Sequence, residues 1–292
     1  MNKKNIFSDY HPLVNFSYFT FVILFSCFLG HPVLLFISVV TSFLYSVKLN
    51  GKKAVKFSLL YLLPLLIFSA VINPLFNHEG ATIITYFKNG NPLTLESMLY
   101  GVSQAFIIVS VIMWFSCFNS VITSDKFVYL FGRIIPSMSL ILSMALRFVP
   151  ETKRRFKEVK NAQAGLLMNE RKGIINKIKK FAKTLSVMVT WSLENAVDTA
   201  DSMKSRGYGI KGRTSYSIYS FSRRDFISLF IIFFGGFYTL YGLIIKKISY
   251  SYFPYADSVF LDISGISFYL VYLLLCLFPL IIDIKEDYRW KS

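Results

Sequence analysis

Long apolar runs constrain this chain more than any other feature of its sequence. A helix needs about 20 consecutive apolar residues to cross the hydrocarbon core of a bilayer, where its backbone groups must bond internally. Six runs approach this length: Leu13–Leu29, Val33–Leu49, Phe57–Phe76, Met98–Phe118, Phe226–Ile245 and Ile266–Ile282. The sequence therefore predicts an all-α integral membrane protein with about six transmembrane helices.

The basic residues predict how these helices are oriented. The chain carries a formal net charge of +16, and Lys and Arg favour the cytoplasmic side of a membrane. Basic clusters lie at Lys3–Lys4, Lys48–Lys56, Arg147–Arg213 and Lys285–Lys291. Placing all four on one side gives a multi-pass protein of the cell membrane with both termini in the cytoplasm. Lys246 and Lys247 fall on the other side, where long side chains can reach the interface.

The segment between the fourth and fifth runs is too long for a simple connection. We expect three parts: spans one to four in 1–118, a large cytosolic or interfacial region in 119–224, and spans five and six in 225–292. Within the middle part, Ile134–Phe148 is predicted as a short buried helix, and an amphipathic helical pattern follows from Glu151.

A second amphipathic pattern follows in the same region. Its apolar stripe consists of Ile174, Ile178, Phe181, Ala182 and Leu185. Lysines accompany this stripe, so the helix suits an anionic lipid surface or the groove of a partner protein.

The stretch "TWSLENAVDTADSMKSRGYG" is the most informative part of the middle region. Ala196, Ala200 and Met203 form one helical row, in which small residues permit a close approach by another helix. Arg206 and Gly207 come at the end of this row. They fit ordinary helix termination by a left-handed glycine, and they equally fit an arginine fork presented to a partner. Both interpretations can hold together.

This stretch also carries a family resemblance. "ADSMKSRGYG" resembles the Ala-x-x-Met-x-Ala-Arg-Gly-Tyr-Gly signature of the T component of energy-coupling factor (ECF) transporters, a group related to CbiQ-type proteins. Asn73–Gly80 and Asn89–Gly101 are similar to further family segments, so the resemblance covers essentially the whole chain. It implies two coupling helices that dock on two cytosolic ABC ATPases and move a small membrane substrate-binding (S) subunit. The implied cargo is a vitamin or a metal ion.

The resemblance also implies two docking motifs. Ser205, Arg206 and Gly207 correspond to the second motif, with Ser205 where the family has Ala. The first motif falls on Ala162, Gln163, Ala164 and Gly165. Leu166 stands near the expected arginine of that motif, and Arg171 would replace it only in a shifted register. Ala196, Ala200 and Met203 are expected to pack helices or contact a partner.

Other classes of function fit the residues less well. The chain has no G-x-x-x-x-G-K-[ST] phosphate loop, so energy from ATP would come through partners, and no cofactor is expected. Dispersed histidines and cysteines argue against a metal site or an enzyme. A self-contained permease or channel with a basic regulatory region is the alternative, although neither a repeat nor a polar midplane site is visible. The bilayer explains the basic charge, so no nucleic-acid partner is expected.

Overall fold

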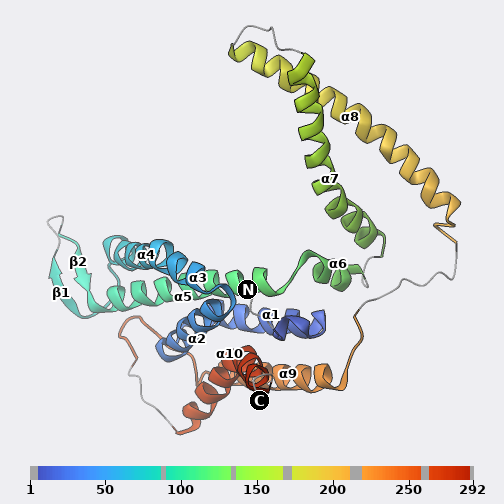
Figure 1. Cartoon of the computed structure of the whole chain (residues 1–292). Coiled ribbons are helices and arrows are strands. Elements are labelled where there is room, and N and C mark those ends of the chain that lie inside the picture. The colour runs from blue at the N-terminus through green and yellow to red at the C-terminus, as the bar shows by residue number, and fades with distance from the viewer. Residues whose placement is uncertain are drawn as a thin grey trace. The chain divides into compact units, whose positions relative to one another are not determined.

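The computed structural model describes residues 6–86, 90–132, 136–166, 173–210, 219–257 and 263–289. The chain divides into two compact units (Figure 1). We call Met1–Phe127 together with Tyr219–Ser292 the membrane unit, and Val128–Ile218 the hairpin unit. Helix α6, Ser124–Gly132, contains the first boundary between them. The domain bounds at 118 and 224 stay a prediction.

The membrane unit consists mainly of helices at the positions of the six apolar runs. Its elements are η1 (Phe7–Asp9), α1 (Pro12–Phe28), α2 (Pro32–Asn50), α3 (Lys52–Phe57), η2 (Ser58–Leu62), α4 (Leu63–Phe76), α5 (Leu95–Val121), α9 (Arg223–Ile244) and α10 (Ile263–Arg289). Among the described residues, five stretches are long and apolar enough to cross a membrane, with α3, η2 and α4 forming one of them; α1 is a shorter apolar helix of 17 residues. The prediction of an all-α membrane protein is confirmed.

Helix α5 lies at the centre of the membrane unit and packs against α1, α2 and α4. Its Trp114 is fully buried, and the indole N–H donates to the Ser38 hydroxyl of α2 over 3.0 Å. Gly101 permits a close approach to α4, because a Cβ there would lie 2.7 Å from the Ala70 carbonyl oxygen. In lipid, helices are held together largely by van der Waals packing, and a small residue at the crossing lets the two helices pack closely.

Two local features are not apparent from the apolar runs alone. Pro64 does not interrupt the third span, because the helix continues through a π turn, η2, which ends two residues before the proline. Such a turn accommodates the backbone hydrogen bond that proline cannot make. The segment between the third and fourth apolar runs contains two short antiparallel strands, β1 (Ile83–Tyr86) and β2 (Pro92–Thr94), which are drawn beside α4 and α5 in Figure 1.

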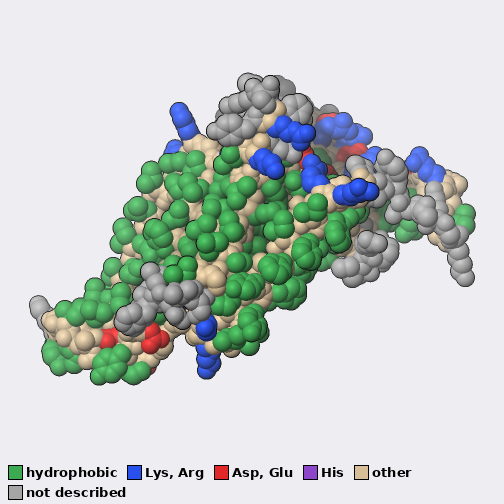
Figure 2. Space-filling model, turned by 90° about the horizontal axis from the view of Figure 1, so that it is seen from below, with side chains coloured by type: hydrophobic (Ala, Val, Ile, Leu, Met, Phe, Trp, Pro, Cys, Tyr) green, Lys and Arg blue, Asp and Glu red, His purple; other side chains and the backbone are tan. Residues whose placement is uncertain are grey.

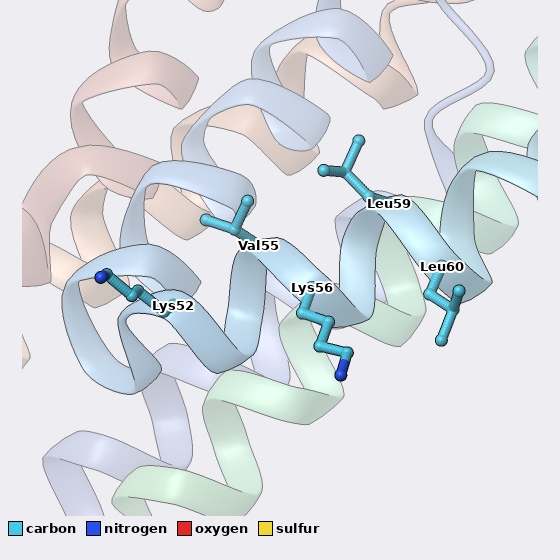
Figure 3. A pocket seen from close by; sticks show the side chains of 5 residues that line it. All are labelled: Lys52, Val55, Lys56, Leu59 and Leu60. Carbon is cyan, nitrogen blue, oxygen red and sulfur yellow. The ribbon is translucent and has the colours of Figure 1, made fainter.

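The outer surface of the membrane unit is largely apolar. Figure 2 shows hydrophobic side chains over a broad face, with Lys and Arg toward its margins. On α3 and η2, a shallow hollow of about 440 Å³ is lined by Lys52, Val55, Lys56, Leu59 and Leu60 (Figure 3). All five residues come from one helical stretch, so the hollow is an open surface. It suits lipid, with the two ammonium groups near the first turns and the leucines beyond them.

The hairpin unit contains two long helices, α7 (Pro136–Leu166) and α8 (Ile174–Ser205). Helix α7 runs unbroken through Pro150, so the expected division between a short buried helix ending at Phe148 and a second helix from Glu151 is wrong. The proline sits inside α7 without terminating it. The amphipathic pattern predicted from Glu151 therefore belongs to the same helix as the apolar stretch before it.

Candidate functional site

The end of α8 forms a complete Schellman cap. The Tyr208 N–H donates to the Met203 carbonyl and the Gly207 N–H to the Lys204 carbonyl, each over 3.0 Å. Gly207 has a φ of +77°, which glycine adopts without the steric cost that a side chain brings. The predicted helix termination is therefore confirmed, and it fixes the backbone of the residue before the glycine.

Arg206 is that residue, and its side chain is exposed. Within the described part of the chain, no hydrogen bond or ion pair engages its guanidinium group. Neighbouring Ser205 is also exposed, but its hydroxyl donates to the Ser202 carbonyl over 2.9 Å. A planar fork of donors on a rigid helix end is a suitable contact for carboxylates or carbonyls of another protein.

A groove of about 450 Å³ between α7 and α8 ends at Arg206. Its walls carry both charges, with Arg147 and Glu151 on α7 and Asp198 on α8. Met203 lines the groove as well. Arg206 therefore stands at the margin of a mixed polar surface rather than in an enclosed pocket.

The first predicted motif lies in the last turns of α7. Ala162, Ala164 and Gly165 are exposed, whereas Gln163 is half-buried against α8. The Thr184 hydroxyl lies 2.8 Å from Gln163 Oε1 and 2.9 Å from the Lys180 carbonyl. Leu166 is the last residue of α7, with its side chain outside the described residues, as is the whole of Arg171. One motif residue is thus engaged within the hairpin.

Aromatic contacts hold α7 and α8 together, and sequence reasoning did not single them out as a set. Phe148 lies against Trp191, with ring centroids 6.4 Å apart, and Phe156 lies against Phe181 at the same separation. The Arg155 guanidinium lies 5.5 Å from the centre of the Trp191 ring, within the range of a cation–π contact. In the sequence, these contacts are indicated by aromatic residues that recur along both helices beside basic residues.

The row of small residues on α8 faces away from α7. Ala196 and Ala200 are exposed, and only Met203 of that row reaches the groove. The row continues an apolar face along α8 whose members recur three or four residues apart and are all exposed. This face comprises Ile175, Ile178, Ala182, Leu185, Val189, Leu193, Ala196 and Ala200. Within the hairpin unit, nothing described covers it.

The two motifs lie well apart along the hairpin. Gln163 of the first motif contacts Thr184, which precedes Ser205 by 21 residues on the continuous helix α8. At 1.5 Å per residue, this separation is roughly 32 Å. In Figure 1, α7 and α8 are drawn crossing near the end of α7. The two predicted motifs therefore lie at separate places on the hairpin unit.

This chain is similar to one protein family and to several known proteins. The model of a family described as CbiQ, cobalt transport protein, matches residues 3–216. The energy-coupling factor transporter transmembrane protein EcfT of Lactobacillus helveticus is 39% identical over 98 residues, 32% of this chain and 35% of that protein. EcfT of Lacticaseibacillus paracasei is 31% identical over 113 residues, 38% of this chain and 41% of that protein. An uncharacterized protein of Mycoplasma genitalium is 27% identical over 153 residues, 48% of this chain and 36% of that protein.

These relatives are each matched over less than half of their own length. The family model, in contrast, covers well over half of this chain and includes both motifs. The chain therefore belongs to the CbiQ family of cobalt transport proteins.

Proposed function

We propose that this chain is the transmembrane coupling subunit of an ECF importer. In this role the chain itself catalyses no reaction. The hairpin unit docks on two cytosolic ABC ATPases, and the membrane unit passes their movement to a small substrate-binding membrane subunit. The cargo class is a vitamin or a metal ion, and both termini lie in the cytoplasm.

The observation that supports this proposal most strongly is the state of Arg206. The Schellman cap holds its backbone at the end of a 32-residue helix, and its charged group has no partner within the described residues. Because the backbone is already fixed, only the side chain has to be ordered on binding, and the exposed guanidinium can donate several hydrogen bonds to a partner.

The geometry of the hairpin supports a mechanical role. Two contact points roughly 32 Å apart on one helical element suit two ATPase subunits, one at each point. Closure of the ATPases on ATP would draw these points along with them. Helices packed through Trp191 and Thr184 would move as a rigid lever, as in hinge or shear transitions.

The buried acids of the membrane unit favour coupling over a self-contained permease. Glu96 accepts the Thr82 backbone N–H, Asp225 accepts that of His11, and Asp283 accepts that of Phe7. Each carboxylate thus joins a helix end to a loop or to another chain segment. Buried acids in a transport pathway would instead face a central cavity.

Replacing Arg206 tests the proposal directly. Arg206→Ala should leave membrane insertion intact and weaken ATPase docking roughly 10- to 100-fold, the effect of losing charge-assisted hydrogen bonds. Co-purification of the ATPases with the tagged full chain, followed by their dissociation rate, measures this. Lys204→Ala, an exposed charge on the same helix end, is the matched control. Equal docking by wild type and Arg206→Ala would refute the role of Arg206, and retention by Arg206→Lys would show that charge alone suffices.

A further inference from the structure

The two connections between the units leave the membrane unit at neighbouring points. The chain enters the hairpin unit after Phe127 and returns at Tyr219. Burial raises the pKa of Tyr219, and the charge of Asp125 on α6 raises it further. The outgoing segment at Lys126 and the returning segment at 221–225 both contact one short segment, Phe7–His11, which we call the N-terminal clasp.

The outgoing connection is fastened by Lys126. This lysine is buried, and its ammonium group donates to the carbonyl of Ser8, to the Ser8 hydroxyl over 3.1 Å and to the Val121 carbonyl over 3.0 Å. Burial lowers the pKa of Lys126 to about 8, while Asp9 acts in the opposite direction. The amine therefore stays mostly protonated at neutral pH, and its bonds are charge-assisted.

The returning connection is fastened by Asp225. Its Oδ1 accepts the backbone N–H of His11 over 3.1 Å, and its Oδ2 accepts the backbone N–H and the hydroxyl of Ser222 over 2.9 and 2.6 Å. The ring of Phe221 packs edge-on against His11 with centroids 5.1 Å apart. The Arg224 guanidinium lies 4.4 Å from the centre of the Tyr10 ring. Residues 221–225 are thus held at several points by the clasp.

The clasp is joined in turn to the membrane helices. His11 caps α1, since its Nδ1 accepts the Leu13 N–H over 3.2 Å, and Asp225 belongs to α9. The Phe7 N–H donates to Asp283 of α10 over 3.0 Å, and both residues are buried. A displacement of either connection would therefore act on α1, α9 and α10 through five residues.

We propose that the N-terminal clasp is the anchor through which movement of the hairpin unit reaches the membrane helices, with Lys126 and Asp225 as its positioning residues. This inference rests on the proposed coupling function and names the residues that transmit it. A lever transmits displacement only where its attachment is firm. Without the clasp, the connecting segments would absorb the movement by local unfolding.

A distance measurement tests this role in the assembled complex. Cys27 at the end of α1 is exposed, whereas Cys117 and Cys276 are buried, so a spin label attaches preferentially to Cys27. A second label is introduced with Phe76→Cys at the exposed end of α4. In the wild-type background, trapping the ATPases with ATP should change the distance between the labels by on the order of 2 Å or more, the scale of helix shifts in coupled proteins.

The clasp variant should separate ATP turnover from this movement. In Lys126→Met, the ATPases should still co-purify and hydrolyse ATP, while the ATP-dependent shift is lost. Lys126→Arg should retain the shift, and Lys53→Met, which removes an exposed lysine of the same unit, should have no effect. If Lys126→Met prevents assembly, Asp225→Asn, which keeps the shape of the side chain, is measured in the same way.

The outcomes separate this inference from the proposed function. A full shift in assembled Lys126→Met or Asp225→Asn overturns the clasp, as does a wild-type complex that hydrolyses ATP without any shift. If neither variant assembles, the clasp serves folding and the inference is equally overturned. A wild-type chain that binds no ATPase overturns the proposed function and removes the basis of the clasp. If a clasp variant loses the ATP-dependent shift while the ATPases still hydrolyse ATP, both the clasp and the proposed function are supported.

Discussion

The membrane unit and the hairpin unit bury their side chains very differently. The membrane unit has a core around Trp114, and the buried acids among its described residues are hydrogen-bonded. In the hairpin unit, Thr184 and Met188 are the buried residues of α8 as far as the structure is described, while Ile178 and Leu193 are 63% and 65% exposed. An exposed apolar face of this length indicates a site for contact with protein or lipid. The membrane unit thus buries a core by its own packing, whereas the described part of the hairpin unit leaves an apolar face uncovered by that unit.

The largest expected effect is the difference in stability between truncating a buried side chain of the membrane unit and truncating an exposed one of the hairpin unit. Trp114→Ala should cost about 3–5 kcal/mol of stability, because it leaves a cavity and removes the hydrogen bond that the indole donates to Ser38. Leu193→Ala should stay within about 0.5 kcal/mol for the isolated chain, since the side chain is already exposed. Thermal unfolding of the purified chain in detergent compares them. Similar losses for both would show that the face of α8 is covered by the chain itself.

A smaller effect is expected at the end of α8. Gly207→Ala forces a side chain into the left-handed region and should cost roughly 1 kcal/mol. The cap would then loosen, so ATPase docking should weaken several-fold although Arg206 is unchanged. Gly30→Ala is the control, because a Cβ there meets nothing within 4 Å and the backbone needs no positive φ. Unimpaired docking by Gly207→Ala would mean that a fixed cap is not needed for the contact.

Breaking the hydrogen bond between Gln163 and Thr184 tests whether Gln163 packs the hairpin or docks on an ATPase. Thr184→Val and Gln163→Ala should each destabilise the hairpin by about 1 kcal/mol, and their effects should not add. If Gln163 acts only in packing, both variants change ATPase docking equally. A loss of docking confined to Gln163→Ala would assign this residue to the docking surface instead. A double-mutant cycle on stability and on docking gives both answers.

The smallest effect is expected at the end of α7. Leu166→Arg restores the arginine of the family pattern next to the exposed Gly165 and should strengthen docking at the first contact point by a few-fold. Complex lifetime in detergent measures this change. An unaltered lifetime would indicate that another residue already supplies the contact.

Local sequence pattern predicted much of this fold. The apolar runs gave the membrane helices to within a few residues, because length and composition decide which segments enter a bilayer. The glycine after Arg206 marked the end of α8, since the left-handed conformation favours that residue. Helices continue past Pro64, which a π turn precedes, and through Pro150, although proline alone tends to interrupt a helix, so local pattern does not fix helix ends at such residues.

Long-range contacts could not be predicted in this way. Lys126 is 118 residues from Ser8 and Asp225 is 214 residues from His11, so no local pattern connects them. In the sequence, Lys126 is one basic residue among many, and only its burial distinguishes it. The internal contact of Gln163 was hidden for the same reason, because its partner Thr184 lies on another helix.

Purification of the tagged chain from its native membrane tests the central claim most directly. The chain is extracted in a mild detergent, and every co-purifying protein is identified by mass spectrometry. Our account predicts two ATPases with phosphate-binding loops together with a small hydrophobic membrane protein, all in stable proportion to the chain. A chain that is recovered alone, or only with copies of itself, would contradict the coupling function and favour a self-contained permease.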